Sequence, residues 1–218
     1  MKKVLYLWKE YSYIIMILIL LLGLINPKIM LVFIICIIAP LLTGKYTGRF
    51  WCGFLCPIGS FFDNITIKLS NNKKAPNLFK SKYIRIIFTT LMMSMFVFEM
   101  ISAFGNPHKS GMVFYGMILE AVIIGSFLAV IYHHRAWCHF CPMGSTGSLV
   151  TFYSRQKKVL SVTKDCTSCK TCESICPMGL SASDFKGKLL DSADCIQCGI
   201  CKNNCPSKAI KYRNDSVL

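Results

Sequence analysis

Eight of the thirteen cysteines fall into two copies of one run, in which four cysteines separated by two, two and three residues are followed by proline. This spacing is typical of bacterial domains that hold two [4Fe–4S] clusters. Three closely spaced thiolates reach three irons of one cluster, and the fourth thiolate leaves to bind the other cluster. The sequence therefore predicts two ligand sets, which are Cys166, Cys169, Cys172 and Cys205 for cluster 1 and Cys195, Cys198, Cys201 and Cys176 for cluster 2.

Two other uses of these cysteines fit the spacing less well. Zinc sites usually combine two pairs of cysteines, whereas each run here has four cysteines and a following proline, Pro177 or Pro206. A disulfide framework would require an oxidising compartment. We therefore expect residues 154–218 to form a small α+β domain of the two-cluster ferredoxin type.

The preceding part, residues 1–153, has the composition of a membrane domain. Lys28 is the only charged residue between Tyr11 and Gly44, and one helix of that length would measure about 50 Å against a hydrocarbon core of roughly 30 Å. Asn26-Pro27 interrupts the run, because a residue before proline avoids the helical conformation. We predict an α-helical membrane domain of four transmembrane helices in two hairpins, with spans at residues 11–25, 28–43, 84–104 and 112–132.

The net charge of +15 raises the alternative of nucleic-acid binding, and its distribution argues against this. All of the 25 basic residues lie on one side of the predicted spans except Lys28 and Lys109, which fall in the two hairpin turns. The positive-inside rule makes the basic side cytoplasmic. The sequence thus predicts a multi-pass protein of the cell membrane with both termini and the clusters in the cytoplasm, and basic loops that contact anionic lipid rather than nucleic acid.

Each predicted hairpin ends in a similar element that contains Arg, Trp and two cysteines, the second followed by proline. These Cys-Pro elements are residues 49–60, with Cys52 and Cys56, and residues 135–145, with Cys138 and Cys141. The second copy is one residue shorter between its cysteines. The order predicts two hairpins in the same orientation, which is a parallel repeat about an axis along the membrane normal.

The four cysteines of the Cys-Pro elements are candidate redox thiols. Two thiol pairs at matched depth could hold a metal, a further iron–sulfur centre or a redox-active thiol set. The alternative is that these elements pack at the membrane interface, where tryptophan anchors to the headgroup region. Cys36, alone in the second span, is expected to be a packing residue.

Two acidic residues fall inside predicted spans, Glu99 in the third and Glu120 in the fourth. Carboxylates at this depth are costly and usually face a bundle interior or water. They are candidates for a proton relay that takes up protons released by quinol oxidation, which makes a quinone a further candidate cofactor. The alternative is a protonated acid bonded to a neighbouring helix.

The order of two hairpins, two Cys-Pro elements and a C-terminal pair of cluster motifs resembles the NapH-type membrane ferredoxins. The same core occurs in the membrane part of NosR and in the FixG and CcoG polyferredoxins. Glu99 followed by Asn106-Pro107 is similar to a region before the last span of NapH. The chain departs from the family at Cys138 and Cys141, which are separated by two residues where three are usual.

This resemblance implies electron transfer between a quinol or flavoprotein donor and a redox partner protein, or support of the maturation of a metalloenzyme. We expect an electron-transfer subunit of an oxidoreductase complex rather than a stand-alone enzyme. The alternatives are a metal-handling protein such as a CcoG-like cupric reductase, and a membrane protein whose clusters sense redox state. Because all three contain the same ferredoxin motifs, the clusters do not separate them.

Overall fold

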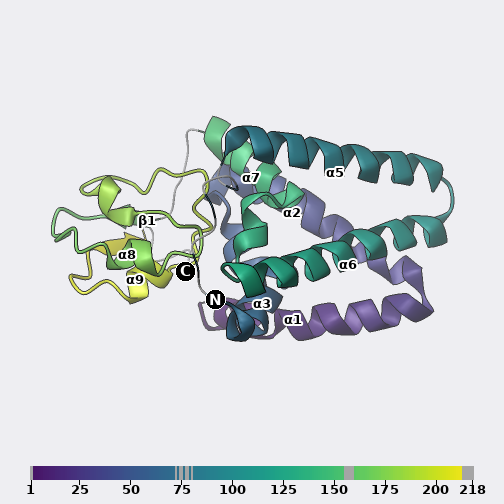
Figure 1. The fold of residues 1–218 in the computed structure, drawn as a ribbon, viewed down its shortest axis with the longest axis horizontal. Coiled ribbons are helices and arrows are strands. Elements are labelled where there is room, and N and C mark those ends of the chain that lie inside the picture. Colours follow the sequence, from purple (N-terminus) through teal and green to yellow (C-terminus); the bar gives the residue numbers. More distant parts are fainter. Residues whose placement is uncertain are drawn as a thin grey trace.

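The computed structural model describes residues 2–71, 73, 76, 79, 81–154 and 160–212. Long helices lie side by side at one end of the molecule, and a small domain of short elements lies at the other (Figure 1). Within these residues, four helical segments are long and apolar enough to cross a membrane, and they are Lys3–Ile25, Pro27–Thr47, Tyr83–Ser102 and Pro107–Ile131. Large apolar side chains such as Leu18, Phe98 and Phe127 are exposed on these helices, as expected for a surface that contacts lipid.

The first hairpin turns at Asn26-Pro27, as the sequence predicts. Helix α1 (Lys2–Ile25) ends there, and the short 3₁₀-helix η1 (Pro27–Phe33) leads directly into α2 (Ile34–Thr47). The Asn26 side chain accepts a hydrogen bond from the Lys28 N–H at 3.3 Å. This cap satisfies a donor at the start of η1, where proline has no N–H to leave unpaired.

The second hairpin also turns at an Asn-Pro pair whose asparagine side chain caps the next helix. Helix α5 (Lys82–Ser102) is followed by α6 (Pro107–Ile131), and the Asn106 side chain accepts hydrogen bonds from the N–H groups of His108 and Lys109 at 3.1 and 3.3 Å. The sequence placed residues 105–111 in the turn. Helix α6 in fact begins at Pro107, because Asn106-Pro107 supplies both a cap and a first helical residue.

The two hairpins pack most closely where η1 meets the first turns of α6. A Cβ added at Gly111 would overlap the carbonyl group of Pro27, so only glycine allows this approach. Around this contact, a core of apolar side chains joins the helices, and it consists of Met16, Met30, Phe33, Phe114 and Ile118.

Gly111→Ala is therefore expected to destabilise the protein by about 1–3 kcal/mol, because the extra methyl group forces the two backbones apart. Gly116→Ala is the matched control, since a Cβ at this position on the same helix would meet nothing within 4 Å. Thermal unfolding of the full chain in detergent measures the stability of both variants. Equal effects of the two substitutions would contradict this packing.

The two Cys-Pro elements form equivalent turns despite their different lengths. The first contains one turn of π-helix, η2 (Trp51–Leu55), before α3 (Pro57–Asn64); the second contains a tighter 3₁₀ turn, η4 (Ala136–His139), before α7 (Pro142–Tyr153). The Cys56 N–H donates to the Trp51 carbonyl at 2.9 Å, and the Cys141 N–H donates to the Trp137 carbonyl at 3.0 Å. The π turn accommodates the extra residue, so in both elements the N–H of the second cysteine donates to the carbonyl of the tryptophan. A short 3₁₀-helix, η3 (Thr66–Leu69), follows α3.

The C-terminal domain is built on a two-stranded antiparallel sheet. Strands β1 (Leu160–Val162) and β2 (Ile210–Tyr212) pair with Leu160 opposite Tyr212. Between them lie three short helices, which are α8 (Thr171–Ser174), η5 (Ala182–Phe185) and α9 (Ile200–Asn203). The apolar face of the sheet packs against several cysteines of the two runs, so the strands form a wall of the cluster region.

Candidate functional site

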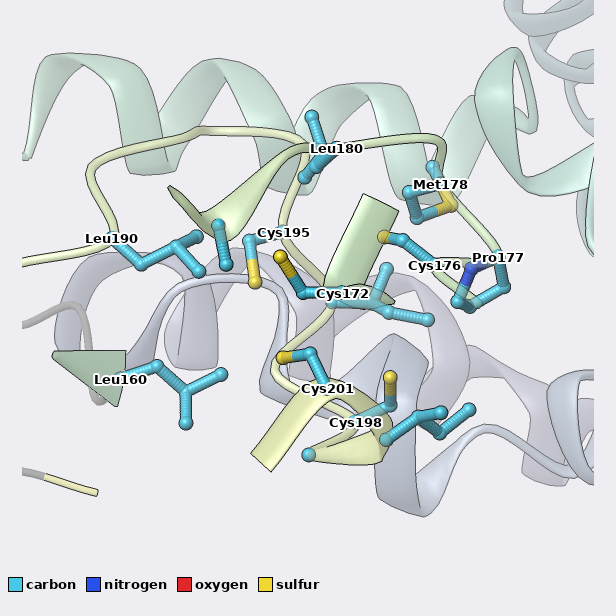
Figure 2. Close-up of a pocket in the computed structure, with 14 residues that line it drawn as sticks. Leu160, Cys172, Cys176, Pro177, Met178, Leu180, Leu190, Cys195, Cys198 and Cys201 are labelled. Carbon is cyan, nitrogen blue, oxygen red and sulfur yellow. The ribbon is translucent and has the colours of Figure 1, made fainter. Parts of the chain in front are cut away.

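The first of two thiol-lined cavities is enclosed mostly by apolar side chains. Figure 2 shows the thiols of Cys172, Cys176, Cys195, Cys198 and Cys201 around it, with Leu160, Met178, Leu180 and Leu190 completing the wall. We call this the inner cavity. Cys176, which comes from the first cysteine run, lies here together with three cysteines of the second run.

The second cavity is lined by cysteines of both runs and includes an exposed thiol. Its cysteines are Cys166, Cys169, Cys172 and Cys205, and Val162 and Ile210 of the sheet line it as well. Cys169 is exposed. We call this the outer cavity. Cys205 of the second run therefore lies with three cysteines of the first run, and Cys172 borders both cavities.

The loops between the cysteines have the same backbone conformation in both runs. Ser168 and Gln197, each just before the second cysteine of its run, have φ of 54° and 58°. Lys170 and Gly199, just after that cysteine, have φ of 59° and 74°. Left-handed residues between right-handed ones turn successive N–H groups to one side, and such concave nests bind anionic iron–sulfur clusters. The backbone thus fits a cluster in each cavity.

The two cavities give their thiols different surroundings. Burial raises the pKa of Cys195 far above its ordinary value and that of Cys201 to about 12. In the outer cavity, hydrogen bonds from Thr171 lower the pKa of Cys169. Burial opposes ionisation of Cys205, but hydrogen bonds from Ser207 and nearby backbone groups outweigh it and lower that pKa. The thiols of the two cavities therefore differ in burial, and exposure to solvent is one factor that sets the reduction potential of a cluster.

The four cysteines of the Cys-Pro elements come together where the helices meet the C-terminal domain. Cys52 is close enough to Cys56, Cys138 and Cys141 for their charges to interact, and Cys56 is close to Cys141. Burial raises the pKa of Cys56 well above its ordinary value and that of Cys141 to about 12. We call this group of four thiols the Cys-Pro site.

Each Cys-Pro element contains a buried arginine that donates a hydrogen bond to the backbone of the other element. Arg49 Nη2 donates to the Cys138 carbonyl at 2.9 Å, and Arg135 Nη1 donates to the Cys52 carbonyl at 2.9 Å. Both arginines are almost fully buried. Glycines make room for them: a Cβ at Gly59 would lie 2.7 Å from Arg135 Nη1, and one at Gly144 would lie 2.5 Å from Arg49 Nη2.

Two carboxylates compensate these arginines from different parts of the chain. Asp63 accepts two hydrogen bonds from Arg135, at 2.7 and 2.8 Å, and also pairs with Lys9 at 3.4 Å. Burial alone would raise the pKa of Asp63, but Arg135, His134 and Lys9 together outweigh burial and hold this pKa well below its ordinary value. Asp194 lies 3.6 Å from Arg49 Nη1 and 2.6 Å from Arg85 Nη1.

Asp194 directly precedes Cys195, so this ion pair links the inner cavity to the helices. The contact continues through the loop that holds the thiols. A Cβ at Gly53 would overlap the Ile196 carbonyl, and Ile196 and Met178 share a buried apolar cluster with Trp137 and other residues of the helical part. The inner cavity therefore lies against the Cys-Pro elements of the helical part.

The remaining candidates lie elsewhere. Glu99 on α5 and Glu120 on α6 are exposed on the helix surfaces, and their role in a proton relay stays a prediction. Cys36 on α2 lies near Cys52 and Cys56, which sequence reasoning did not anticipate. Arg49 and Arg135 were recognised as a recurring residue two positions before tryptophan, but their bonds to the opposite Cys-Pro element were not predicted.

Comparison with known proteins agrees with the thiol chemistry. A family model described as a 4Fe-4S dicluster domain matches residues 165–210, and one described as a 4Fe-4S binding domain matches residues 29–76 and 115–159. The chain is an iron–sulfur protein. The two segments of the second match each contain one Cys-Pro element and the span before it.

Two similar proteins come from Methanocaldococcus jannaschii, and both are named as uncharacterised. MJ0750 is 29% identical over 149 residues, and MJ0749 is 27% identical over 142 residues. Each alignment covers 63% of this chain, but only 62% and 54% of the two relatives, so this chain spans less than two thirds of their length. No solved structure matches the chain.

Proposed function

We propose that this protein is a membrane-anchored ferredoxin that carries single electrons between a donor in the membrane and a soluble redox partner. The observation that carries this proposal is the position of the inner cavity, whose loop at Ile196 packs on Gly53 of the helical part. In this proposal, one redox site would lie against the helical part and the other would include the exposed Cys169. A [4Fe–4S] cluster in each cavity would supply the one-electron chemistry.

The ligand sets follow from the groups of thiols in the two cavities. Cys166, Cys169, Cys172 and Cys205 would hold the cluster of the outer cavity, and Cys195, Cys198, Cys201 and Cys176 that of the inner cavity. The role of the protein is to fix the positions of the two clusters and to set their potentials by burial and hydrogen bonds. The exposed thiol of Cys169 would raise the potential of the outer cluster, which favours electron flow outward from the membrane.

The cross-ligation is tested by single substitutions in the full chain. Cys205→Ser removes a residue of the second cysteine run, yet it should disturb the cluster of the outer cavity and leave that of the inner cavity intact. Cys176→Ser should have the reverse effect. Electron paramagnetic resonance of the reduced protein measures both signals, and Cys36→Ser is the control. Loss of the inner cluster in Cys205→Ser would contradict the assignment.

The membrane part fits the NapH-type architecture, with a quinol or a flavoprotein as the donor. Support comes from the match to the 4Fe-4S binding domain, whose two segments each include a Cys-Pro element and part of the helix before it, and from the common Asn-Pro start of η1 and α6. We further propose that the thiols of the Cys-Pro site form a separate redox centre between this donor and the inner cavity.

The proposed topology places both termini and the clusters in the cytoplasm and the two Asn-Pro turns outside. Cysteines introduced at Lys28 and Lys109 should react with an impermeant maleimide added to intact cells, because both positions would be exposed on the outer face. A cysteine introduced at Lys73 should react only after lysis. Labelling of Lys73→Cys in intact cells, without labelling at the other two positions, would reverse the orientation.

A further inference from the structure

We propose that the Cys-Pro site binds a third [4Fe–4S] cluster, with Cys52, Cys56, Cys138 and Cys141 as ligands and with Arg49 and Arg135 balancing its charge. This rests on the proposed function, in which the site is a redox centre, and it names the cofactor. Four cysteines are the usual ligand set of a cubane. Here each repeat contributes two of them.

The backbone around these thiols is arranged to stabilise negative sulfur. The Gly59 N–H donates to Cys56 Sγ at 3.4 Å at the start of α3. At the start of α7, the N–H groups of Gly144 and Met143 hydrogen-bond to the Cys141 thiol. Both helices therefore direct their N-terminal N–H groups at a cysteine of the site, the arrangement that favours thiolate.

The charge around the site is unbalanced without an anion. Among the described residues, Lys9, Arg49 and Arg135 pair with two carboxylates near the site, Asp63 and Asp194, and Asp194 is shared with Arg85, which lies outside the Cys-Pro elements. An uncompensated buried cation is costly. A cubane with four thiolate ligands is a dianion, so it would neutralise the excess. Protonated thiols would leave that excess in place.

Several buried donors at this site also have no acceptor. Within the described ranges, Arg49 Nε and Nη1, Trp51 Nε1 and Trp137 Nε1 are buried and make no hydrogen bond. Arg135 Nη1 already lies 3.8 Å from Cys138 Sγ. Buried polar groups are normally satisfied, and the sulfur atoms of a bound cluster would offer acceptors that the protein lacks here.

The thiols of the Cys-Pro site are not grouped as a single metal ion would require. In the described part of the chain, no three His, Cys, Asp or Glu side chains come as close together as one metal ion requires, and this holds equally for the cysteines of the inner and outer cavities. Arg49 also approaches Asp194, beside Cys195. A cluster at the Cys-Pro site would thus share an arginine with the neighbouring cavity.

The test is the iron content of the full chain, purified anaerobically in detergent. Three cubanes require about twelve iron and about twelve sulfide atoms per chain, and two require about eight. We expect about twelve in the wild type and about eight in a variant with all four cysteines of the Cys-Pro site replaced by serine. Cys36→Ser is the matched control and should retain about twelve.

A wild-type yield of about eight with both ferredoxin signals present would overturn the third cluster and leave the proposed function intact. Copper or zinc bound to the wild type instead of the iron beyond about eight atoms would also overturn the third cluster and leave the proposed function intact. A yield near zero would instead overturn the proposed function. If the fourfold variant does not accumulate, the wild-type yield alone decides.

The proposed role of Arg49, which is to balance the charge of the cluster, is tested separately. Arg49→Met removes the positive charge beside the site but leaves Asp194 paired with Arg85, so the potential of the third signal should fall while Arg49→Lys keeps it. Arg85→Met is the control, because Arg85 pairs with Asp194 without contacting the Cys-Pro elements. An equal shift in Arg49→Met and Arg85→Met, or no shift in either, would show that Arg49 does not balance a cluster.

Discussion

Replacement of Arg135 by methionine is expected to lower the free energy of unfolding by about 3–5 kcal/mol, the usual cost of breaking a buried ion pair from one side. Arg135 is 1% exposed and holds Asp63 through two hydrogen bonds. Its loss leaves that carboxylate with only Lys9 and His134, at 3.4 Å each. It also leaves the Cys52 carbonyl without its donor.

The measurement is thermal or denaturant unfolding of the full chain in detergent, followed by circular dichroism. The double variant Arg135→Met with Asp63→Asn is the control, since it removes the unpaired charge and should recover part of the stability. Arg135→Lys keeps the charge but loses the paired hydrogen bonds, so it should fall between the wild type and Arg135→Met. A double variant no more stable than Arg135→Met would show that the ion pair is not the source of the effect.

Gly53→Val is expected to separate the C-terminal domain from the helices. The side chain would enter the space of the Ile196 carbonyl, and neither backbone can yield without moving its element. Overpacking of this kind costs about 1–3 kcal/mol. Because the strain falls on the contact between domains, both ferredoxin clusters should still assemble, while their reduction by the membrane donor should slow markedly.

This prediction is tested by two measurements on the same preparation. Iron and sulfide content reports assembly, and stopped-flow reduction of the clusters in proteoliposomes reports electron transfer. Gly147→Ala on α7 is the matched control, since a Cβ there would make only ordinary contacts of 3.6 Å with Pro40. A wild-type rate of cluster reduction in Gly53→Val would show that this contact does not lie on the electron path.

The sequence was most informative where the chemistry depends on local spacing. Asn-Pro pairs place the start of η1 and α6 because capping involves only adjacent residues, and four apolar runs place the long helices. The ligand sets and the domain boundary at residue 154 remain predictions, although the thiols of each proposed set line one cavity.

The contacts that join the repeats were not predictable, because they link residues more than 80 positions apart. The bonds from Arg49 to Cys138 and from Arg135 to Cys52 depend on how two hairpins pack. The shorter second Cys-Pro element looked like a departure from symmetry. Only the backbone reveals that a π turn and a 3₁₀ turn end in the same bond, from the cysteine N–H to the tryptophan carbonyl.

The exchange of arginines between the Cys-Pro elements has the form of an isologous interface, in which each half presents the same group to the other. The helical part is in this sense a dimer of hairpins joined in one chain. Covalent linkage lets the two halves differ, and they differ in the carboxylate that pairs with each arginine. Asp63, which pairs with Arg135, comes from the helical part, whereas Asp194, which pairs with Arg49, comes from the C-terminal domain. A symmetric dimer would offer that domain two equivalent docking positions. The fused chain offers one, so electrons transferred as proposed would have a single entrance.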